Sequence, residues 1–278
     1  MLHIESKFNM DKKLFYIVGF LFGVFVSTLN AQNNNYEVTI LNNGEEVDLT
    51  GIKFGVISGK GLYAMLGNTL VSMDEERSEY VDEFSLPDST IIIEDMVILP
   101  NMFVCKYDSS IYYLNKRNNL RGFSIDTDNF SIHYASDSTI FILVGDKVFE
   151  SNPRKGKPML KFKYAAQKII KYMPMCHDEA YVVTENELLI KTQQGLQSLL
   201  CMPEPITAVN ISSHGIFIGT PTKLFKYNDI NTLQLIDTLP IAQILNDGEY
   251  IYIITTDSTI YRLQRLSEQN KTDMANGI

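Results

Sequence analysis

Short apolar runs separated by polar turn-forming residues recur along most of the chain. In each unit an aromatic residue follows an aliphatic or similar residue, and successive aromatic residues lie 35 to 40 positions apart. The aromatic positions are Tyr63, Phe103, Phe141, Tyr181, Phe217 and Tyr252. A second apolar pair follows each of them after seven to nine residues, with turn formers such as Gly145-Asp146 in between. Apolar runs joined by such turns are typical of β-hairpins, so the pattern predicts six hairpins.

Another strand-like segment precedes each hairpin, and most hairpins are followed by one more. The preceding segments are residues 51–58, 91–99, 130–136, 168–176, 206–212 and 241–245. The following segments are residues 80–86, 120–125, 159–164, 196–202 and 233–239. Four strands in a repeat of this length are typical of a β-propeller blade. The apolar runs are continuous, as in Ile251-Tyr252-Ile253-Ile254, which indicates strands buried on both faces.

The two ends of the repeat region predict a closed ring. The sixth repeat ends near Leu266 without an outer strand, whereas a spare strand-like segment, residues 36–41, precedes the first repeat. We expect this segment to complete the last blade, because closure removes an exposed sheet edge. The predicted fold is therefore all-β, a six-bladed β-propeller with an N-terminal strand that closes the last blade. A seventh, degenerate blade within residues 36–60 would have too little chain, and an open solenoid would need capping repeats.

The first residues predict an export signal. Lys12 and Lys13 precede an apolar run over residues 14–29, and the small residue Ala31 stands before a polar stretch. This is typical of a secretory signal peptide, and the run of 16 residues is shorter than the roughly 20 of a membrane-spanning helix. The alternative is an uncleaved anchor or a buried helix. The predicted divisions are a signal peptide over 1–31, the propeller over 32–266 and a polar tail over 267–278, in a periplasmic or secreted protein.

Composition and charge narrow the class of partner. The hydrophobic share of 45% excludes a disordered chain. Lys and Arg number 24 against 33 Asp and Glu, a formal charge of −9, which argues against nucleic-acid binding. We expect no stable membrane insertion after signal cleavage, a monomer, and a protein, peptide or glycan as partner.

One segment and the cysteines depart from this acidic average. A basic cluster, Arg154 to Lys171, contains no acid and is interpreted as a solvated, charge-protected strand edge, with a docking surface for an acidic partner as the alternative. Cys105, Cys176 and Cys201 lie in apolar runs, so all three are expected to be buried free thiols.

One hairpin resembles a known kind of repeat. Its first strand and turn are Gly215-Ile216-Phe217-Ile218-Gly219-Thr220, and its second strand is Leu224-Phe225-Lys226-Tyr227-Asn228. This segment is similar to the strand-turn-strand core of the sensor-type propeller repeats of bacterial two-component regulators and exported ligand-binding propellers. The resemblance covers the hairpin of each repeat and contains no catalytic motif. It implies a propeller architecture and a binding role.

Acidic residues on the connections between blades are the candidate binding residues. Propellers commonly bind ligands over the central channel, on the face of these connections. Asp88, Asp126, Asp128 and Glu204 are expected there. Their oxygen atoms suit a hard cation, so calcium is the one cofactor considered. No metal ligand set is assigned, because turn residues that bond their own backbone explain the same side chains.

No catalytic residue is assigned. Cys176 and His177 are adjacent, and adjacent residues of a strand point to opposite faces. His133 and His214 are isolated, and the sequence contains no Gly-x-Ser-x-Gly, His-Glu-x-x-His, phosphate-loop or dinucleotide motif. The sequence favours an exported, non-catalytic binding or scaffold module. The alternative is a propeller-type hydrolase, lactonase or lyase that uses a divalent cation at the channel.

Overall fold

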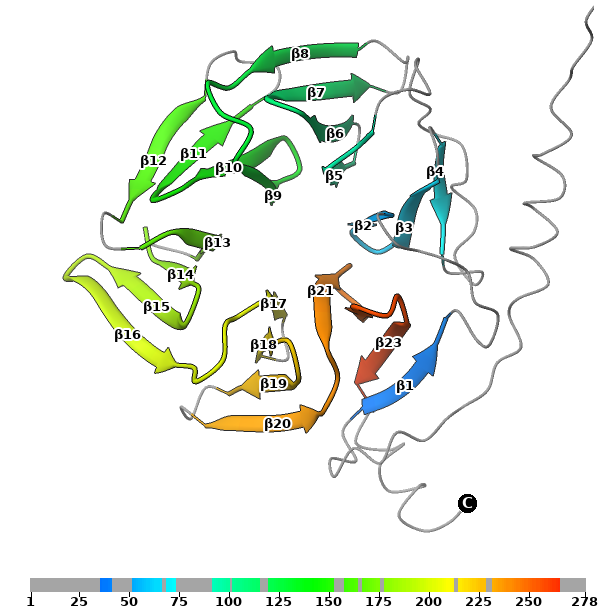
Figure 1. The fold of residues 1–278 in the computed structure, drawn as a ribbon, viewed down its shortest axis with the longest axis vertical. Coiled ribbons are helices and arrows are strands. Elements are labelled where there is room, and N and C mark those ends of the chain that lie inside the picture. Colours follow the sequence, from blue (N-terminus) through cyan, green and yellow to red (C-terminus); the bar gives the residue numbers. More distant parts are fainter. Residues whose placement is uncertain are drawn as a thin grey trace, which may run out of the picture.

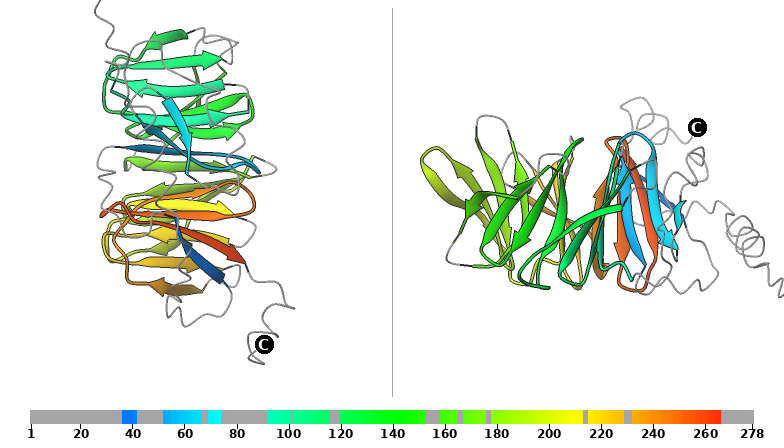
Figure 2. Two further views of the ribbon diagram at one scale, coloured as in Figure 1. Left: turned by 90° about the vertical axis from the view of Figure 1, so that its right-hand side faces the viewer. Right: turned by 90° about the horizontal axis from the view of Figure 1, so that it is seen from above.

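The computed structural model shows an all-β ring. It describes residues 36–41, 52–66, 69–73, 92–100, 102–115, 120–152, 158–164, 167–175, 178–212, 215–228 and 232–265. Six antiparallel sheets are arranged around a centre, and each one is a blade (Figure 1). Seen from the side, the strands run across the thickness of a disc (Figure 2). The prediction of a six-bladed β-propeller is confirmed.

The blades follow one another in chain order. Blade 1 contains β2 (Lys53–Ile57), β3 (Gly61–Leu66) and β4 (Thr69–Ser72). Blade 2 contains β5 (Asp95–Leu99), β6 (Met102–Tyr107), β7 (Ser110–Asn115) and β8 (Leu120–Ser124). Blade 3 contains β9 (Ser131–Ser136), β10 (Thr139–Val144), β11 (Lys147–Ser151) and β12 (Met159–Lys163). Blade 4 contains β13 (Ile169–Pro174), β14 (Ala180–Thr184), β15 (Glu187–Thr192) and β16 (Gly195–Cys201).

The last two blades complete the ring. Blade 5 contains β17 (Ala208–Ser212), β18 (Gly215–Gly219), β19 (Leu224–Tyr227) and β20 (Leu233–Asp237). Blade 6 contains β21 (Ile241–Asn246), β22 (Ile251–Thr255), β23 (Ile260–Arg265) and β1 (Tyr36–Ile40). The residues that the structure describes contain no helix long and apolar enough to cross a membrane.

Strand β1 closes the ring as predicted. It pairs antiparallel with β23, with Tyr36 opposite Arg265 and Ile40 opposite Tyr261. The sheet order β1-β23-β22-β21 therefore joins the N-terminal strand to three C-terminal strands. This pairing supplies the ladder that the edge of β23 would otherwise lack.

Several predictions fall outside the described residues. Blade 1 has three described strands, and its expected outer strand at 80–86 lies outside them. So do the expected signal peptide over 1–31, the tail over 267–278 and Asp88. Cys176, His177 and His214 are also outside.

The core lies between neighbouring blades. At the recurring aromatic position Tyr63, Phe103, Phe217 and Tyr252 have no exposed surface, whereas Tyr181 is half-buried. All five residues of β22 are buried, which confirms the prediction that its continuous apolar run forms a strand buried on both faces. Because the sheets stack face to face around the ring, the faces of each blade pack against the faces of its neighbouring blades.

The two described cysteines differ in exposure. Cys105 is buried, and burial raises the pKa of its thiol to about 12. Cys201 is exposed at the end of β16, so the prediction that it is buried was wrong. The apolar run around it forms an outer strand whose residues are largely exposed, because no other strand of the described residues pairs with that edge.

We expect this difference to appear in thiol labelling. Iodoacetamide should modify Cys201 in the folded protein and should leave Cys105 unmodified until the protein is denatured, because only an accessible thiolate reacts. Peptide mass mapping would measure both sites in one sample. Modification of Cys105 at the rate of Cys201 under native conditions would contradict the described packing of blade 2.

Candidate functional site

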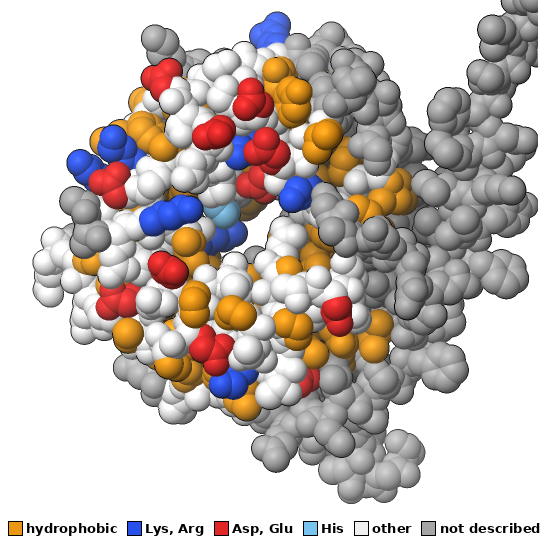
Figure 3. Space-filling model, in the orientation of Figure 1, with side chains coloured by type: hydrophobic (Ala, Val, Ile, Leu, Met, Phe, Trp, Pro, Cys, Tyr) orange, Lys and Arg blue, Asp and Glu red, His pale blue; other side chains and the backbone are white. Residues whose placement is uncertain are grey.

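The first strand of each blade borders a central channel. These inner strands are β2, β5, β9, β13, β17 and β21, and they surround the centre of the ring (Figure 1). Half-buried polar side chains occur on all six of them: Lys53, Asp95, His133, Lys171, Asn210 and Gln243. Figure 3 shows an opening through the ring, with histidine, basic and acidic side chains gathered beside it. The channel is therefore the candidate site.

Three side chains of blades 3 and 4 form a hydrogen-bonded chain in this site. Lys171 Nζ lies 3.2 Å from His133 Nδ1, and His133 Nε2 lies 2.9 Å from Ser131 Oγ. Ser131 and His133 are two residues apart on β9, so strand geometry places them on the same side. We call these three residues the Lys171–His133–Ser131 chain.

The lysine sets the direction of the chain. An ammonium group only donates hydrogen bonds, so His133 Nδ1 accepts from Lys171 and carries no proton. The proton of the neutral ring is then on Nε2, which donates to Ser131 Oγ. The arrangement resembles a serine–histidine pair in its distances, but Nε2 is a donor and cannot take the serine proton. In this arrangement His133 therefore supplies no base to Ser131.

The pKa values agree with this direction. Burial and the charge of Lys171 hold the pKa of His133 well below its usual 6.5, so the ring is neutral. Burial also lowers the pKa of Lys171, while the charge of Asp95 opposes that shift.

Stability should consequently fall in mild acid. The folded ring resists protonation, whereas an unfolded histidine takes up a proton as the pH falls through about 6.5. We expect the step from pH 7.5 to pH 5.5 to cost wild type about 1.4 kcal/mol more than it costs His133→Gln. Urea unfolding at both pH values would measure this. Equal losses in the two proteins would contradict a neutral His133 in the folded channel.

Asp95 is the acid on the same side of the channel, and its oxygens are already occupied. Oδ1 accepts from the Met96 N–H and Oδ2 from the Ile132 N–H, both at 2.9 Å. The second bond joins blade 2 to blade 3. Burial raises the pKa of Asp95, partly offset by these two backbone donors. Asp95 therefore serves as a brace between blades.

The carboxylate of Glu94, next to Asp95 in the chain, also has protein partners. Glu94 Oε2 pairs with Lys106 Nζ at 2.6 Å, and its Oε1 accepts from the Asp108 N–H. The bond to Lys106 lowers the pKa of Glu94. Lys106 Nζ also lies 4.7 Å from the centre of the Phe130 ring. This pair belongs to the packing of blade 2 against blade 3.

Blades 5 and 6 present a neutral side of the channel. Asn210 Nδ2 donates to the Ile244 carbonyl at 3.1 Å, and Gln243 Nε2 donates to the Phe54 carbonyl at 3.3 Å. These amides join β17 to β21 and β21 to β2. The channel is thus divided into a charged side on blades 1 to 4 and an amide side on blades 5 and 6.

The structure places three of the four predicted binding residues on connections between blades. Asp126 and Asp128 are exposed on the connection from blade 2 to blade 3. Glu204 lies on the connection from blade 4 to blade 5, and Asp88 lies outside the described residues. Within the described part of the chain, no group of three or more His, Cys, Asp or Glu side chains is placed to hold a metal ion.

Glu204 has a local partner set instead. It accepts from the hydroxyls of Thr220 and Thr222 at 2.9 and 2.7 Å. Lys223 Nζ lies 3.1 Å from its other oxygen. These bonds lower the pKa of Glu204. They join the connection before blade 5 to the β18–β19 turn, so the carboxylate fastens two loops together.

The basic cluster is also divided by the fold. Lys161 and Lys163 are exposed on the outer strand β12, where they lie 3.4 and 3.8 Å from Glu150 and Asp146. Lys171 lies instead on the inner strand β13, half-buried beside His133. The interpretation of Lys171 as part of a solvated edge was wrong, because Lys161 and Lys163 belong to the outer strand of blade 3 whereas Lys171 belongs to the inner strand of blade 4.

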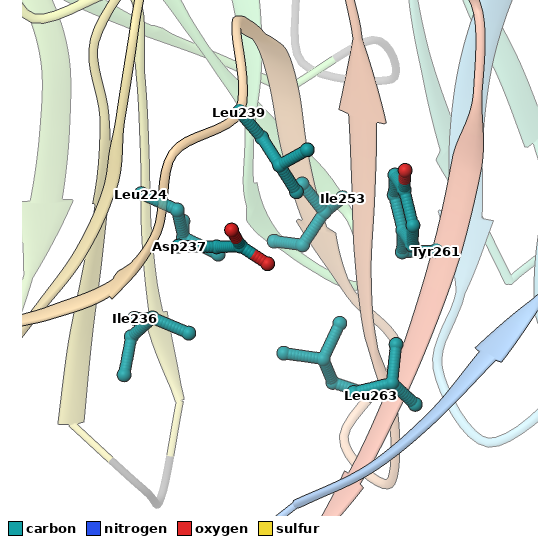
Figure 4. A pocket seen from close by; sticks show the side chains of 8 residues that line it. Leu224, Ile236, Asp237, Leu239, Ile253, Tyr261 and Leu263 are labelled. Atoms are coloured by element: carbon teal, nitrogen blue, oxygen red, sulfur yellow. The ribbon is translucent and has the colours of Figure 1, made fainter. Parts of the chain in front are cut away.

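A separate apolar pocket lies between blades 5 and 6. Figure 4 shows Leu224, Ile253 and Leu263 lining it, with Asp237 and Tyr261 as polar neighbours. One oxygen of Asp237 accepts from the Thr238 N–H at 2.6 Å. The pocket forms part of the packing between these blades and offers few polar groups to orient a ligand.

Sequence reasoning missed the residues that the fold gathers. His133 was interpreted as isolated, Lys171 as an edge lysine, and Lys53 and Asp95 were not considered. A signal was present, because all four lie in the segments predicted to precede a hairpin. Aligning those segments as neighbours around one channel would have brought the four residues together.

Comparisons with known proteins support the fold. No protein-family model matches the chain, and no curated protein matches it. Virginiamycin B lyase from Staphylococcus aureus with quinupristin is similar in structure, at TM-score 0.56 and 16% identity, over 88% of this chain and 94% of that chain. BamB from Moraxella catarrhalis is similar at TM-score 0.52 and 9% identity, over 77% of this chain and 85% of that chain.

A third similar structure is the extracellular domain of BT4673 from B. thetaiotaomicron. The TM-score is 0.53 at 18% identity, over 78% of this chain and 33% of that chain. At these identities the likeness shows the fold alone. The chain is a β-propeller, and its relation to any one propeller family is not defined by these matches.

Proposed function

We propose that this chain is an exported, non-catalytic β-propeller that binds a ligand in its central channel as a binding or scaffold module. The partner is a protein, a peptide or a glycan. The expected location is the periplasm or the cell exterior.

The observation that carries the proposal is the direction of the Lys171–His133–Ser131 chain. Its hydrogen bonds run from a lysine donor to a histidine and on to a serine. Such an arrangement offers polar contacts in a rigid frame but supplies no base to activate the serine. A group that binds without reacting is what a recognition site needs.

The similar structures are compatible with this role. They include the extracellular domain of BT4673 and BamB, and they also include a lyase. One fold hosts both binding and catalysis, so the argument rests on the channel residues.

The alternative is a hydrolase, lactonase or lyase that uses calcium or another divalent cation. Its residues would be Asp88, Asp126, Asp128 and Glu204. It predicts that calcium raises the melting temperature and that a chelator lowers it, because a cation bound to the folded state stabilises it. A melting temperature indifferent to both would count against this alternative.

The binding role is tested by what co-purifies with the full chain. Wild-type protein and Lys171→Met would be isolated in parallel from the export compartment, and bound molecules would be identified by mass spectrometry. Retention of one defined molecule by wild type, with binding confirmed using that purified molecule, would support the proposal. Turnover of that molecule by the purified protein would contradict a non-catalytic role.

A further inference from the structure

We propose that the channel recognises the carboxylate of a small polar ligand, held by Lys171 and Ser131 on one side and attracted by Lys53 from the opposite blade. This inference rests on the proposed binding function and specifies its ligand class. A carboxylic sugar and a peptide with a free C-terminus share this chemistry.

The ends of the Lys171–His133–Ser131 chain are hydrogen-bond donors. Lys171 uses one of its three N–H groups on His133, which leaves two. Ser131 Oγ receives the proton of His133 Nε2, so its own O–H points to another acceptor. Within the described residues the serine hydroxyl has no protein acceptor. A chain of bonds that polarise one another strengthens the donor at its end. An oxyanion with two oxygens fits these donors.

Charge favours a single negative group. Lys53 lies on blade 1 and Lys171 on blade 4, so the two face each other across a six-bladed ring. Among the described residues, neither ammonium group has a carboxylate within ion-pair distance, and both oxygens of Asp95 accept backbone N–H groups. Two lysines, one aspartate and a neutral histidine leave one positive charge, in a protein whose formal charge is −9. A monoanion such as a carboxylate neutralises it.

The amide side suits the rest of such a ligand. The side-chain amide nitrogens of Asn210 and Gln243 donate to neighbouring backbone carbonyls. Their side-chain oxygens are then available as acceptors. These acceptors, on the two blades that lie between the blades of Lys171 and Lys53, would receive the hydroxyl groups of a sugar acid or the N–H groups of a peptide. The two sides together predict a ligand with an acid at one end and donors at the other.

Titration calorimetry of the full chain would test this with two matched pairs of probes. Glucuronate is compared with glucose, and N-acetyl-dialanine with its C-terminal amide. We expect a carboxylate probe to bind and its neutral counterpart to bind at least about 10-fold more weakly, as charged hydrogen bonds imply. Binding by glucuronate indicates a sugar acid, and binding by the peptide acid indicates a chain terminus.

Variants connect the binding to the named residues. Lys171→Met should lower the affinity for the carboxylate probe at least about 10-fold, and Ser131→Ala should lower that affinity severalfold. Lys147→Met removes an exposed lysine of β11 and should leave the affinity unchanged. Melting temperatures would verify that each variant folds. If Lys171→Met does not fold, Ser131→Ala replaces it as the test variant.

Three results would overturn the inference. They are no binding of either carboxylate, equal binding of the neutral counterparts, or equal affinity of Lys171→Met and wild type. If a co-purified partner still binds Lys171→Met as it binds wild type, the binding function stands and the carboxylate site fails. If no molecule binds the wild type at all, the binding function itself fails.

Discussion

Replacing Phe217 by alanine should lower the free energy of unfolding by about 3–5 kcal/mol, the usual cost of deleting a buried phenylalanine ring. Phe217 has no exposed surface and packs between blades 5 and 6 with Ile241 and Ile253. Its ring meets that of Tyr36 edge-on at 5.9 Å. Because Tyr36 belongs to the closing strand β1, the cavity left by the deleted ring would also weaken the packing of that strand against blade 5.

The melting temperature measures this effect. For a chain of this size we expect a decrease of roughly 6–20 °C. Leu235→Ala is the matched control, because it removes a large side chain from the same blade at a position that is 49% exposed. That variant should change the stability by only about 0.5 kcal/mol. Equal decreases in both variants would contradict the assignment of the core to the space between blades.

Replacing Gly219 by alanine should lower the free energy of unfolding by about 3 kcal/mol, because here the substitution adds an atom to a filled space. An added Cβ would lie 2.6 Å from Ile241 Cβ and nearer still to its Cγ2. Ile241 has no exposed surface, so its side chain has no space into which to move. Overpacking of this kind typically costs about 1–3 kcal/mol, and this overlap is severe. Equilibrium urea unfolding would give the value.

Two comparisons separate crowding from other causes. In Gly219→Ala with Ile241→Ala, the loss should be smaller than the sum of the two single losses by about 1 kcal/mol, because the second change removes crowded atoms. Gly59→Ala tests backbone strain alone, since its φ is +69° and, beyond its chain neighbours, no atom of the described residues lies within 4 Å of the added Cβ. We expect about 1–2 kcal/mol there. Strict additivity of the double variant would argue against the crowded contact.

The architecture was predictable because it repeats. A strand buried on both faces needs a continuous apolar run, and six such hairpins at nearly equal spacing admit few folds. The closing strand was predictable by counting, since the last repeat lacked an outer strand and residues 36–41 supplied one. Boundaries agreed closely, as for the segment predicted at 206–212 and found as β17 (Ala208–Ser212).

The sequence placed candidate binding residues on the connections between blades, and it did not single out the polar side chains of the inner strands that border the channel. Acidic residues on the connections were expected to act at the channel, yet Glu204 is occupied by Thr220, Thr222 and Lys223. Carboxylates in turns attract the local hydroxyl and ammonium groups before they reach a ligand. A linear pattern cannot distinguish a carboxylate that fastens a loop from one that faces a channel.

By itself the sequence determined the all-β class, the number of blades and the closing strand, because these follow from the period and polarity of residues close together in the chain. Only the tertiary structure decided that Lys171 contacts His133, 38 positions away, and that Lys53 lies on the opposite blade. Those contacts join different blades, and a single side chain on an inner strand has no sequence signal for its neighbour across the ring. The channel chemistry is set by how six similar sheets meet at the centre.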